Sequence, residues 1–340
     1  MIRAITFQCP DRAPIQHWAQ PGAYMRHGSA LLELFERYPD DFDNEGVNPP
    51  EPASVERLTE VREWRDAWGT LWHGLKGFTS GEVKVPAIPD WSRWSEYQFP
   101  PLPEPSYFEW FRAKVERRHP KWFVLASGGT LFQQMISLRG MTNLLMDLAE
   151  DRPEVHELAD RLVEYRLAHI KRYLETQVDA IEFADDWGAQ DRMLIHPELW
   201  RNFFKPRYKR LFEPVKEAGR FIWFHTDGWT LDILEDLIEL GIDVLNPEHD
   251  VMGDERVAKH VAGRVCIKTN IDTQYLLPRG SPDEIRAYVK KLLVLFGNYN
   301  GGIILHGEIG PDVPLENVQA LFSAFYEFGS YPFHWIRGEL

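Results

Sequence analysis

The stretch RFIWFHTDGWTLDILEDLIELGIDVLNP, residues 220–247, contains the repeating unit from which the fold can be inferred. It opens with an apolar run, continues with a helical pattern over Thr230–Leu240, reaches Gly241 as a helix-ending residue, and returns to an apolar run at Val244–Leu245. Strand, helix and strand in this order are typical of a parallel sheet. The continuous apolar character of the first run favours a strand that is covered on both faces.

The same alternation continues through residues 111–340, where six strands are predicted: Trp122–Ala126, Ala180–Ala184, Phe221–Phe224, Val244–Leu245, Val265–Lys268 and Ile303–Leu305. The helices predicted between and after them are Leu131–Leu148, Glu154–Gln177, Pro197–Ala218, Thr230–Leu240, Pro282–Phe296 and Pro314–Phe328. No glycine-rich phosphate loop of the GxGxxG or GxxxxGKS/T type is present, which disfavours an open doubly wound sheet. We therefore predict an α/β fold, a (β/α)8 TIM barrel whose main part is residues 111–340.

Residues 1–110 differ from the rest because Pro and Trp are dense there and interrupt regular elements. We interpret this region as an irregular N-terminal cap that also supplies the first barrel elements, so that residues 1–340 form one domain. A separate N-terminal domain is the alternative. Helices are predicted here over Gly28–Tyr38 and Val55–Trp72, and the two missing barrel strands near Gly22–Tyr24 and Val83–Ile88.

Composition narrows the class of protein. The net charge of −14 disfavours nucleic acid or an anionic membrane as partner, because the long-range field repels phosphates. No apolar run reaches the roughly 18–20 residues of a membrane helix, and the first residues lack the pattern of a secretory signal, so a cytoplasmic location is expected. Two cysteines, Cys9 and Cys266, are too few for a disulfide framework.

Polar and ionisable residues follow five of the predicted strands, in the segments 185–190, 225–228, 247–250, 270–272 and 306–308. In a barrel these segments meet at one mouth, because all parallel strands end on the same face. For Asp232, Asp250 and Asp272 an ordinary turn or helix cap is the competing interpretation. His225 and His306 are poor turn formers, so a functional role is favoured for them.

Two side chains at this mouth, His225 and Asp227, lie two residues apart and should point to the same side of an extended chain. With His306 and Glu308 from a later strand they can form a nitrogen and carboxylate site for a divalent metal, such as zinc. Without metal, the same groups can act as general acid and base. The candidate catalytic residues are Asp185, Asp186, His225 and Asp227; since Asp185 and Asp186 are neighbours, one of them is expected to be structural.

Candidate substrate-binding residues lie in or near the same segments: Arg139, Trp187, Gln190, Asn246 and Asp272. The tryptophans Trp68, Trp72, Trp187 and Trp229 offer a surface for a flat ligand, with ordinary packing as the competing interpretation. The ligand is expected to be a small molecule.

Three runs carry a family resemblance: DDWGAQDRMLIHPELWRNFFKPRYKRL from Asp185, FHTDGWTLDILEDLIELGIDVLNP from Phe224, and GGIILHGEIGPDVPLENVQAL from Gly301. They resemble the uroporphyrinogen decarboxylase superfamily, which comprises tetrapyrrole decarboxylases and corrinoid-dependent methyltransferases on a (β/α)8 barrel. The decarboxylases themselves share an N-terminal Met-Arg-Gln-Ala-Gly-Arg stretch and a catalytic Asp in a Phe-Ser-Asp context. Neither motif is present here, so the resemblance favours the methyltransferase branch.

In that branch zinc is held by a His-x-Cys pair and a later Cys. This chain has His225-Thr226-Asp227 at the first place and Gly307 or Glu308 near the second, so the resemblance implies a metal held by histidine and carboxylate. It also implies a corrinoid (cobalamin) presented by a partner protein. Three functions stay open: corrinoid-dependent methyl transfer, which is favoured; decarboxylation, in which Asp185 or Asp227 faces a developing cation; and a barrel that binds a ligand without turnover.

Overall fold

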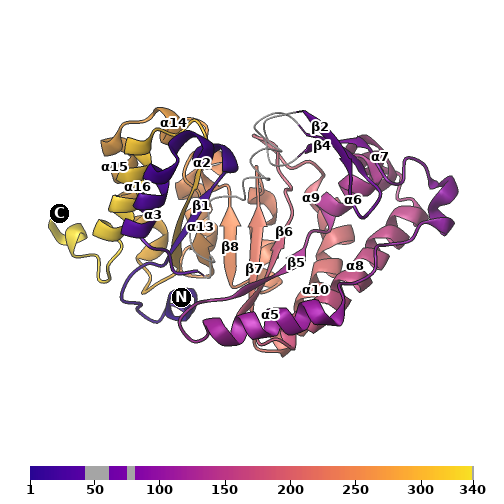
Figure 1. Ribbon diagram of the computed structural model, residues 1–340, viewed down its shortest axis with the longest axis horizontal. Coiled ribbons are helices and arrows are strands. Elements are labelled where there is room, and N and C mark those ends of the chain that lie inside the picture. Colours follow the sequence, from indigo (N-terminus) through magenta and orange to yellow (C-terminus); the bar gives the residue numbers. More distant parts are fainter. Residues whose placement is uncertain (43–60, 75–80, 339–340) are drawn as a thin grey trace.

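The computed structural model describes residues 1–42, 61–74 and 81–338. Seven parallel strands form one curled sheet, in the spatial order β1-β10-β9-β8-β7-β6-β5 (Figure 1). Their bounds are β1 Ile15–Ala19, β5 Leu125–Gly129, β6 Ala180–Ala184, β7 Phe221–Thr226, β8 Val244–Pro247, β9 Cys266–Lys268 and β10 Ile303–Ile309. The six strands predicted in the second part of the chain are thus confirmed, with the first of them displaced by three residues.

Helices cover the outer face of the sheet, with α8 and α10 beside β5 to β7 and with α3, α15 and α16 on the opposite side of the molecule (Figure 1). The first group comprises α5 Pro105–Arg118, α6 Phe132–Arg139, α7 Met141–Ala149, α8 Pro153–Leu174, α9 Pro197–Leu199, the π-type turn Trp200–Phe204, and α10 Lys205–Glu217. The second comprises Leu231–Ile233, α11 Leu234–Glu239, α12 His249–Met252, α13 Asp254–Val261, α14 Leu276–Arg279, α15 Pro282–Leu292, the turn Leu293–Gly297, and α16 Leu315–Phe328. Short segments complete the chain: α1 Ile2–Ile5, α2 Pro21–His27, α3 Ser29–Arg37, and the 3-10 turns Trp91–Glu96 and His334–Gly338.

The two edges of the sheet, β1 and β5, are approached by the same short segment. The backbone N–H of Asp41 donates to the carbonyl oxygen of Ile15 at 2.9 Å, and Phe42 forms a parallel bridge with Phe123, just before β5. The chain then enters residues 43–60, which lie outside the described part. The described residues therefore form a seven-stranded, barrel-like parallel sheet, and complete eight-stranded closure is not seen in them.

The structure confirms one of the predictions for the N-terminal region and contradicts others. The helix predicted over Gly28–Tyr38 is confirmed as α3. The strand predicted at Gly22–Tyr24 is wrong: Pro21, in the first turn, begins helix α2, and the barrel strand β1 lies just before it. The barrel strand predicted near Val83–Ile88 is also wrong, because residues 83–85 belong to β4 (Gly81–Val85), which pairs in a separate antiparallel sheet.

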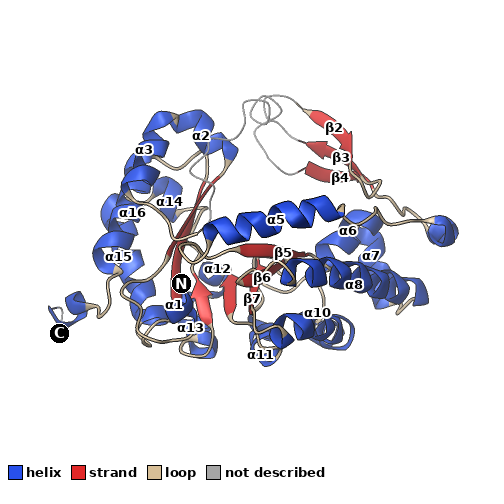
Figure 2. Cartoon of the chain, turned by 60° about the horizontal axis from the view of Figure 1, so that its bottom comes forward, coloured by secondary structure: helices blue, strands red, loops and turns tan. Residues whose placement is uncertain are grey.

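That separate sheet has the order β2-β3-β4, with β2 at Arg62–Arg65 and β3 at Leu71–Gly74, and it stands apart from the main sheet (Figure 2). The helix predicted over Val55–Trp72 is therefore wrong from residue 62 onward, while residues 55–60 lie outside the described part. Trp64 and Trp72 are directly opposite each other across β2 and β3, and their rings stack with centroids 6.2 Å apart. Cross-strand aromatic pairing, rather than helical periodicity, accounts for the spacing of these tryptophans.

The interior of the curled sheet is layered. Its lower layer is apolar and contains Ala180, Trp223, Val244, Cys266 and Ile304, one from each of five neighbouring strands. Because side chains alternate in direction along a strand, the residue two positions further on each strand points to the same interior. Those next positions are occupied by Glu182, His225, Asn246, Lys268 and His306, so a polar layer lies directly above the apolar one. The sequence thus places a polar site at the carboxyl ends of the strands.

Among the described helices none is long and apolar enough to cross a membrane.

Candidate functional site

A cavity of about 350 Å³ opens at the carboxyl ends of the strands. Its lining comes from six strands: Gln16 and Trp18 on β1, Glu182 and Ala184 on β6, His225 on β7, Asn246 on β8, Lys268 on β9, and His306 and Glu308 on β10. Residues from opposite ends of the chain therefore meet in one place. Of the five segments predicted to meet at the mouth, 225–228 and 306–308 contribute residues to this lining. In α/β barrels this face is the one that carries the reacting groups.

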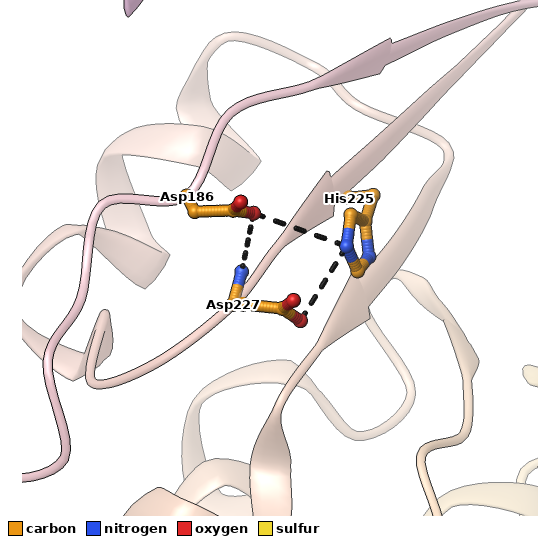
Figure 3. Close-up of side chains that lie close together, drawn as sticks. All are labelled: Asp186, His225 and Asp227. Atoms are coloured by element: carbon orange, nitrogen blue, oxygen red, sulfur yellow. Dashed lines mark hydrogen bonds and ion pairs between the residues drawn. The ribbon is translucent and has the colours of Figure 1, made fainter. Parts of the chain in front are cut away.

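Three possible metal ligands converge at the rim of this cavity: Asp186, His225 and Asp227 (Figure 3). His225 Nε2 lies 3.4 Å from Asp227 Oδ1 and 3.9 Å from Asp186 Oδ1. The backbone N–H of Asp227 also donates to Asp186 Oδ1, at 3.2 Å, and Gln133 Nε2 donates to Asp186 Oδ2, at 2.6 Å. One ligand atom from each of the three residues fits within 4.8 Å of the others, which is compact enough for a single ion.

The orientation of the His225 ring is set by Asn246. The amide nitrogen of Asn246 donates to the carbonyl oxygens of Lys268 (3.0 Å) and Thr269 (3.4 Å), so its amide oxygen faces His225. That oxygen lies 2.9 Å from His225 Nδ1, which must therefore carry the proton of this hydrogen bond. When the ring is neutral, the lone pair of Nε2 therefore faces the two carboxylates, which is the arrangement by which outer partners prepare a histidine ligand.

The ionisable groups at the rim shift one another's pKa values. Burial lowers the pKa of His225, but the hydrogen bond and charge of Asp227, with the charge of Asp186, outweigh this and raise it above its ordinary value. Burial and the charge of Asp227 raise the pKa of Asp186. Glu248, which accepts from the N–H of Gly228 at 2.7 Å, also has a raised pKa because of burial and the nearby carboxylates. Carboxylates that repel one another in this way favour a cation between them.

The donor set fits a divalent metal in its chemistry. One imidazole nitrogen and two carboxylates are the donor types of several zinc and other transition-metal sites. A lone pair on Nε2 facing two carboxylates is unfavourable unless a proton or a cation lies between them. Asp186, His225 and Asp227 would hold such an ion, with Asn246 and Gln133 as the outer partners that orient them.

The two loops that carry these ligands touch each other closely. Gly188 N donates to the carbonyl oxygen of Asp227 at 3.1 Å, and Trp229 N donates to that of Ala189 at 2.8 Å. Gly228 has φ +74°, and a Cβ on it would lie 2.3 Å from backbone atoms of Gly188. Only glycine satisfies both the backbone angle and the close approach, so the pair fixes Asp186 and Asp227 relative to each other.

Asp185, a candidate catalytic residue, does not face the cavity. Its carboxylate is 1% exposed and accepts from the backbone N–H groups of Leu131 (2.8 Å), Phe132 (3.0 Å) and Gln133 (2.7 Å), as well as from the Tyr208 hydroxyl. Burial raises its pKa to about 6, although these donors act in the opposite direction. Of the two neighbouring aspartates, Asp185 thus caps the start of helix α6 and Asp186 reaches the mouth.

The cap gives a prediction about stability. Asp185→Asn puts an amide NH2 among four donors, and leaving a buried donor unpaired costs about 1–3 kcal/mol. We expect the free energy of unfolding to fall by about that amount, while zinc binding at the rim is retained. Urea unfolding with zinc titration of the native variant measures both quantities. Asp191→Asn, at an exposed position, is the matched control and is expected to leave both unchanged. A variant as stable as the parent contradicts the capping role.

Two predicted substrate-binding residues are structural instead. Trp187 is fully buried, and its ring stacks on that of Phe132, the first residue of helix α6, with centroids 4.4 Å apart. Arg139 is also buried: its guanidinium donates to Asp147 at 2.7 Å and to the carbonyl oxygens of Ile88 and Pro89. It closes the end of α6 and does not line the cavity.

The remaining predicted residues divide between the cavity and its surroundings. Asn246 lines the cavity and positions His225, whereas Gln190 is exposed on the outer loop and is not part of the lining. Asp272 accepts from the N–H groups of Gln274 and Tyr275, both at 2.8 Å, which is the turn role considered for it from the sequence. His306 and Glu308 line the cavity, but the described ligand group contains Asp186 in their place.

His306 and Glu308 have partners of their own. His306 Nδ1 donates to the carbonyl oxygen of Gln16 at 3.2 Å, and burial lowers its pKa well below the ordinary value, so the ring is neutral. Glu308 accepts from Gln20 at 2.5 Å, and burial raises its pKa. Both are placed to contact a substrate in the cavity.

Two charged lining residues, Glu182 and Lys268, were not predicted, because the sequence prediction considered the loops that follow the strands. Both lie within their strands, at inward positions two residues after Ala180 and Cys266. A charged residue inside an otherwise apolar strand is itself a signal of a polar interior layer, and the period of two would have found both. Gln16 and Trp18 were not predicted either, because strand β1 was not.

Comparison with known proteins settles the family. The sequence pattern of the uroporphyrinogen decarboxylase family matches residues 109–328, more than half of the chain. The chain belongs to this family. In structure it is similar to a methyltransferase from Methanosarcina mazei, with a TM-score of 0.66 at 18% identity over 96% of both chains, which supports the shared barrel-like fold.

The curated relatives of this chain include two kinds of enzyme. It is 30% identical to a uroporphyrinogen decarboxylase of Thermus thermophilus over 51% of its own length, and this match spans about half of that enzyme, 48%. It is 25% identical to a uroporphyrinogen decarboxylase of Legionella pneumophila over 96% of both chains. It is also 28% identical to a methylcobamide:CoM methyltransferase of Methanosarcina barkeri, over 58% of this chain and 56% of that enzyme. Decarboxylases and a methyltransferase are thus both relatives, and the reaction must be argued from the site.

Proposed function

We propose that this family member is a corrinoid-dependent methyltransferase component. It would act on a small molecule at the mouth of the sheet, use a divalent metal held by Asp186, His225 and Asp227, and receive its corrinoid from a partner protein. The observation that carries the proposal is the compact ligand group itself, aimed at a polar cavity by Asn246. The relationship to a methylcobamide:CoM methyltransferase supports it.

The charge of the cavity supports methyl transfer over tetrapyrrole decarboxylation. Among the described lining residues Lys268 is the one lysine or arginine, against the carboxyl groups of Glu182 and Glu308. A tetrapyrrole with many carboxylates needs several cations to offset its charge on binding. A small methyl donor or acceptor needs far fewer.

The side chains have distinct tasks in this proposal. A divalent ion in the ligand group would supply a Lewis acid that polarises an oxygen or other heteroatom bound to the methyl group. Asn246 keeps His225 in the tautomer that offers Nε2, and the Gly188 and Gly228 contact keeps the two aspartates in place. Glu308, whose pKa is raised by burial, is the candidate to exchange a proton with the heteroatom as the methyl group leaves or arrives.

The test is a methyl-transfer assay on the zinc-treated protein. Cob(I)alamin, kept reduced, is mixed with 3-methoxybenzoate or methoxyacetate, and formation of methylcobalamin is followed by its visible absorbance. We expect zinc-dependent formation with the parent protein and loss of it in Asp227→Asn. The proposal is contradicted if no methylcobalamin forms from these donors and if no methyl group is transferred in the reverse direction, from methylcobalamin to a small thiol.

Decarboxylation is the second candidate, because a uroporphyrinogen decarboxylase aligns with nearly the whole chain. In that reaction Asp227 would face a developing cation in the substrate. Release of carbon dioxide from uroporphyrinogen, together with inert corrinoid, would favour this candidate. Inertness in both assays, with retained ligand binding, would favour a barrel without turnover.

A further inference from the structure

Lys268 is unusual among the buried cations of the described chain. It ends strand β9, is 8% exposed, and lines the cavity one layer above Trp223. Its Nζ lies 5.9 Å from the centroid of the Trp223 ring. The other buried lysine or arginine side chains there are Arg139, paired with Asp147 at 2.7 Å, and Arg207, paired with Asp160 at 3.0 Å.

No such partner is found for Lys268 among the described residues. Glu182, Glu308 and Asp227 act on its charge, but none of them approaches within ion-pairing distance of Nζ, in contrast to the aspartates beside the two arginines. Burial therefore dominates and lowers the pKa of Lys268 to about 8, so the group remains mostly charged at neutral pH. A buried charge without a close partner is costly, and an anion in the cavity would supply one.

The position of this cation relative to the ligand group is also informative. Lys268 lies beside Asn246, whose amide bridges the Lys268 carbonyl oxygen and His225 Nδ1. The cavity therefore has a cationic group on the β9 wall and the ligand group on the rim above β6 and β7. A small molecule with an anionic end at Lys268 would extend its other end toward Asp186, His225 and Asp227.

We propose that Lys268 is the carboxylate-binding residue of the cavity, and that the substrate is a small molecule with a single carboxylate. The assignment of the other end as the methyl-bearing group rests on the proposed function; the binding of a carboxylate by Lys268 rests on the cavity alone. Gln16, whose side-chain oxygen is buried without a hydrogen-bond partner, lines the same cavity and offers an acceptor to a hydroxyl or amine on the ligand.

The test is a calorimetric comparison of 3-methoxybenzoate with its neutral isostere 3-methoxybenzamide at pH 7, with the full-length protein. We expect the parent to bind the carboxylate at least ~10-fold more tightly than the amide, which is the factor that 1.4 kcal/mol of binding free energy gives. Lys268→Met and Lys268→Gln are expected to lose this preference. Lys84→Met removes an exposed lysine that pairs with Glu63, and is expected to keep it.

To test whether a bound metal contributes to the preference for the carboxylate, the titrations are repeated after chelator treatment and with the Asp227→Asn variant. A preference for the carboxylate that survives both, and that Lys268→Met abolishes, supports the proposal whatever reaction the protein performs. Equal binding of the two probes by the parent overturns it. A preference that Lys268→Met retains but that disappears with the metal also overturns it, and assigns the carboxylate to the metal.

Discussion

Replacing His225 by alanine is expected to weaken zinc binding by more than ~100-fold, because replacing even an outer partner of a metal ligand costs ~10–100-fold. His225 offers the one nitrogen of the ligand group, and its Nε2 lies 3.9 Å from Asp186 Oδ1 and 3.4 Å from Asp227 Oδ1. Without the ring, two carboxylates held near each other remain, too few to complete a tetrahedral site. Isothermal titration with zinc, and metal analysis of protein purified without chelator, measure the change.

Three further variants separate this site from the one predicted by sequence. Asn246→Ala is expected to weaken zinc binding by ~10–100-fold, because the ring loses the partner that fixes its tautomer. His306→Gln is expected to retain zinc binding, since His306 lies outside the described ligand group. His260→Ala, at a surface histidine paired with Glu235, is the matched control. Zinc binding that depends on His306 and not on Asp186 would restore the original assignment and contradict the structural one.

Much of the fold could be predicted because its deciding feature is local. Continuous apolar runs such as Phe221–Phe224 are covered on both faces, and helices with Pro in the first turn separate them. Each strand and each helix can therefore be recognised from its own stretch of sequence. The first part of the chain offers no such unit. Its strands β2 and β3 are four residues long and are stabilised by Trp64 stacking on Trp72, a contact between residues that no periodic pattern relates. The sequence pattern of such short strands, which are paired through their side chains, resembles that of an interrupted helix.

The site shows the same division. His225 and Asp227 could be predicted because they directly follow an apolar strand in a parallel arrangement, and such residues meet at the mouth. The choice between Asp185 and Asp186 could not be made from sequence, since it depends on which carboxylate meets the N–H groups of Leu131 to Gln133, more than fifty residues earlier. Trp187 was misassigned for the same reason. Its partner, Phe132, belongs to a helix whose position only the tertiary structure gives.

Lys268→Met is expected to stabilise the ligand-free, metal-free protein at pH 7, by on the order of 3 kcal/mol. The estimate follows from the difference between the ordinary pKa of 10.5 and the value of about 8 in the fold, at 1.36 kcal/mol for each unit. The charged amine is penalised by burial and has no close carboxylate among the described residues, whereas a methionine of similar length carries no charge into the cavity. Replacing buried charges by apolar groups of similar volume stabilises other proteins for this reason.

The direction of the pKa shift of Lys268 determines how the stability gained by Lys268→Met depends on pH. Since the pKa of Lys268 is lower in the fold than in the unfolded chain, its unfavourable contribution is fully present below pH 8, declines between about 8 and 10.5, and is absent above. The stability gained by Lys268→Met, measured by urea unfolding with Lys84→Met as control, should shrink over that window. Saturating 3-methoxybenzoate should reduce the difference at pH 7, because the parent binds the anion more tightly than the variant does. A variant less stable than the parent at pH 7, without ligand, would mean that a partner already neutralises Lys268, and the cavity would then have no need of an anionic substrate.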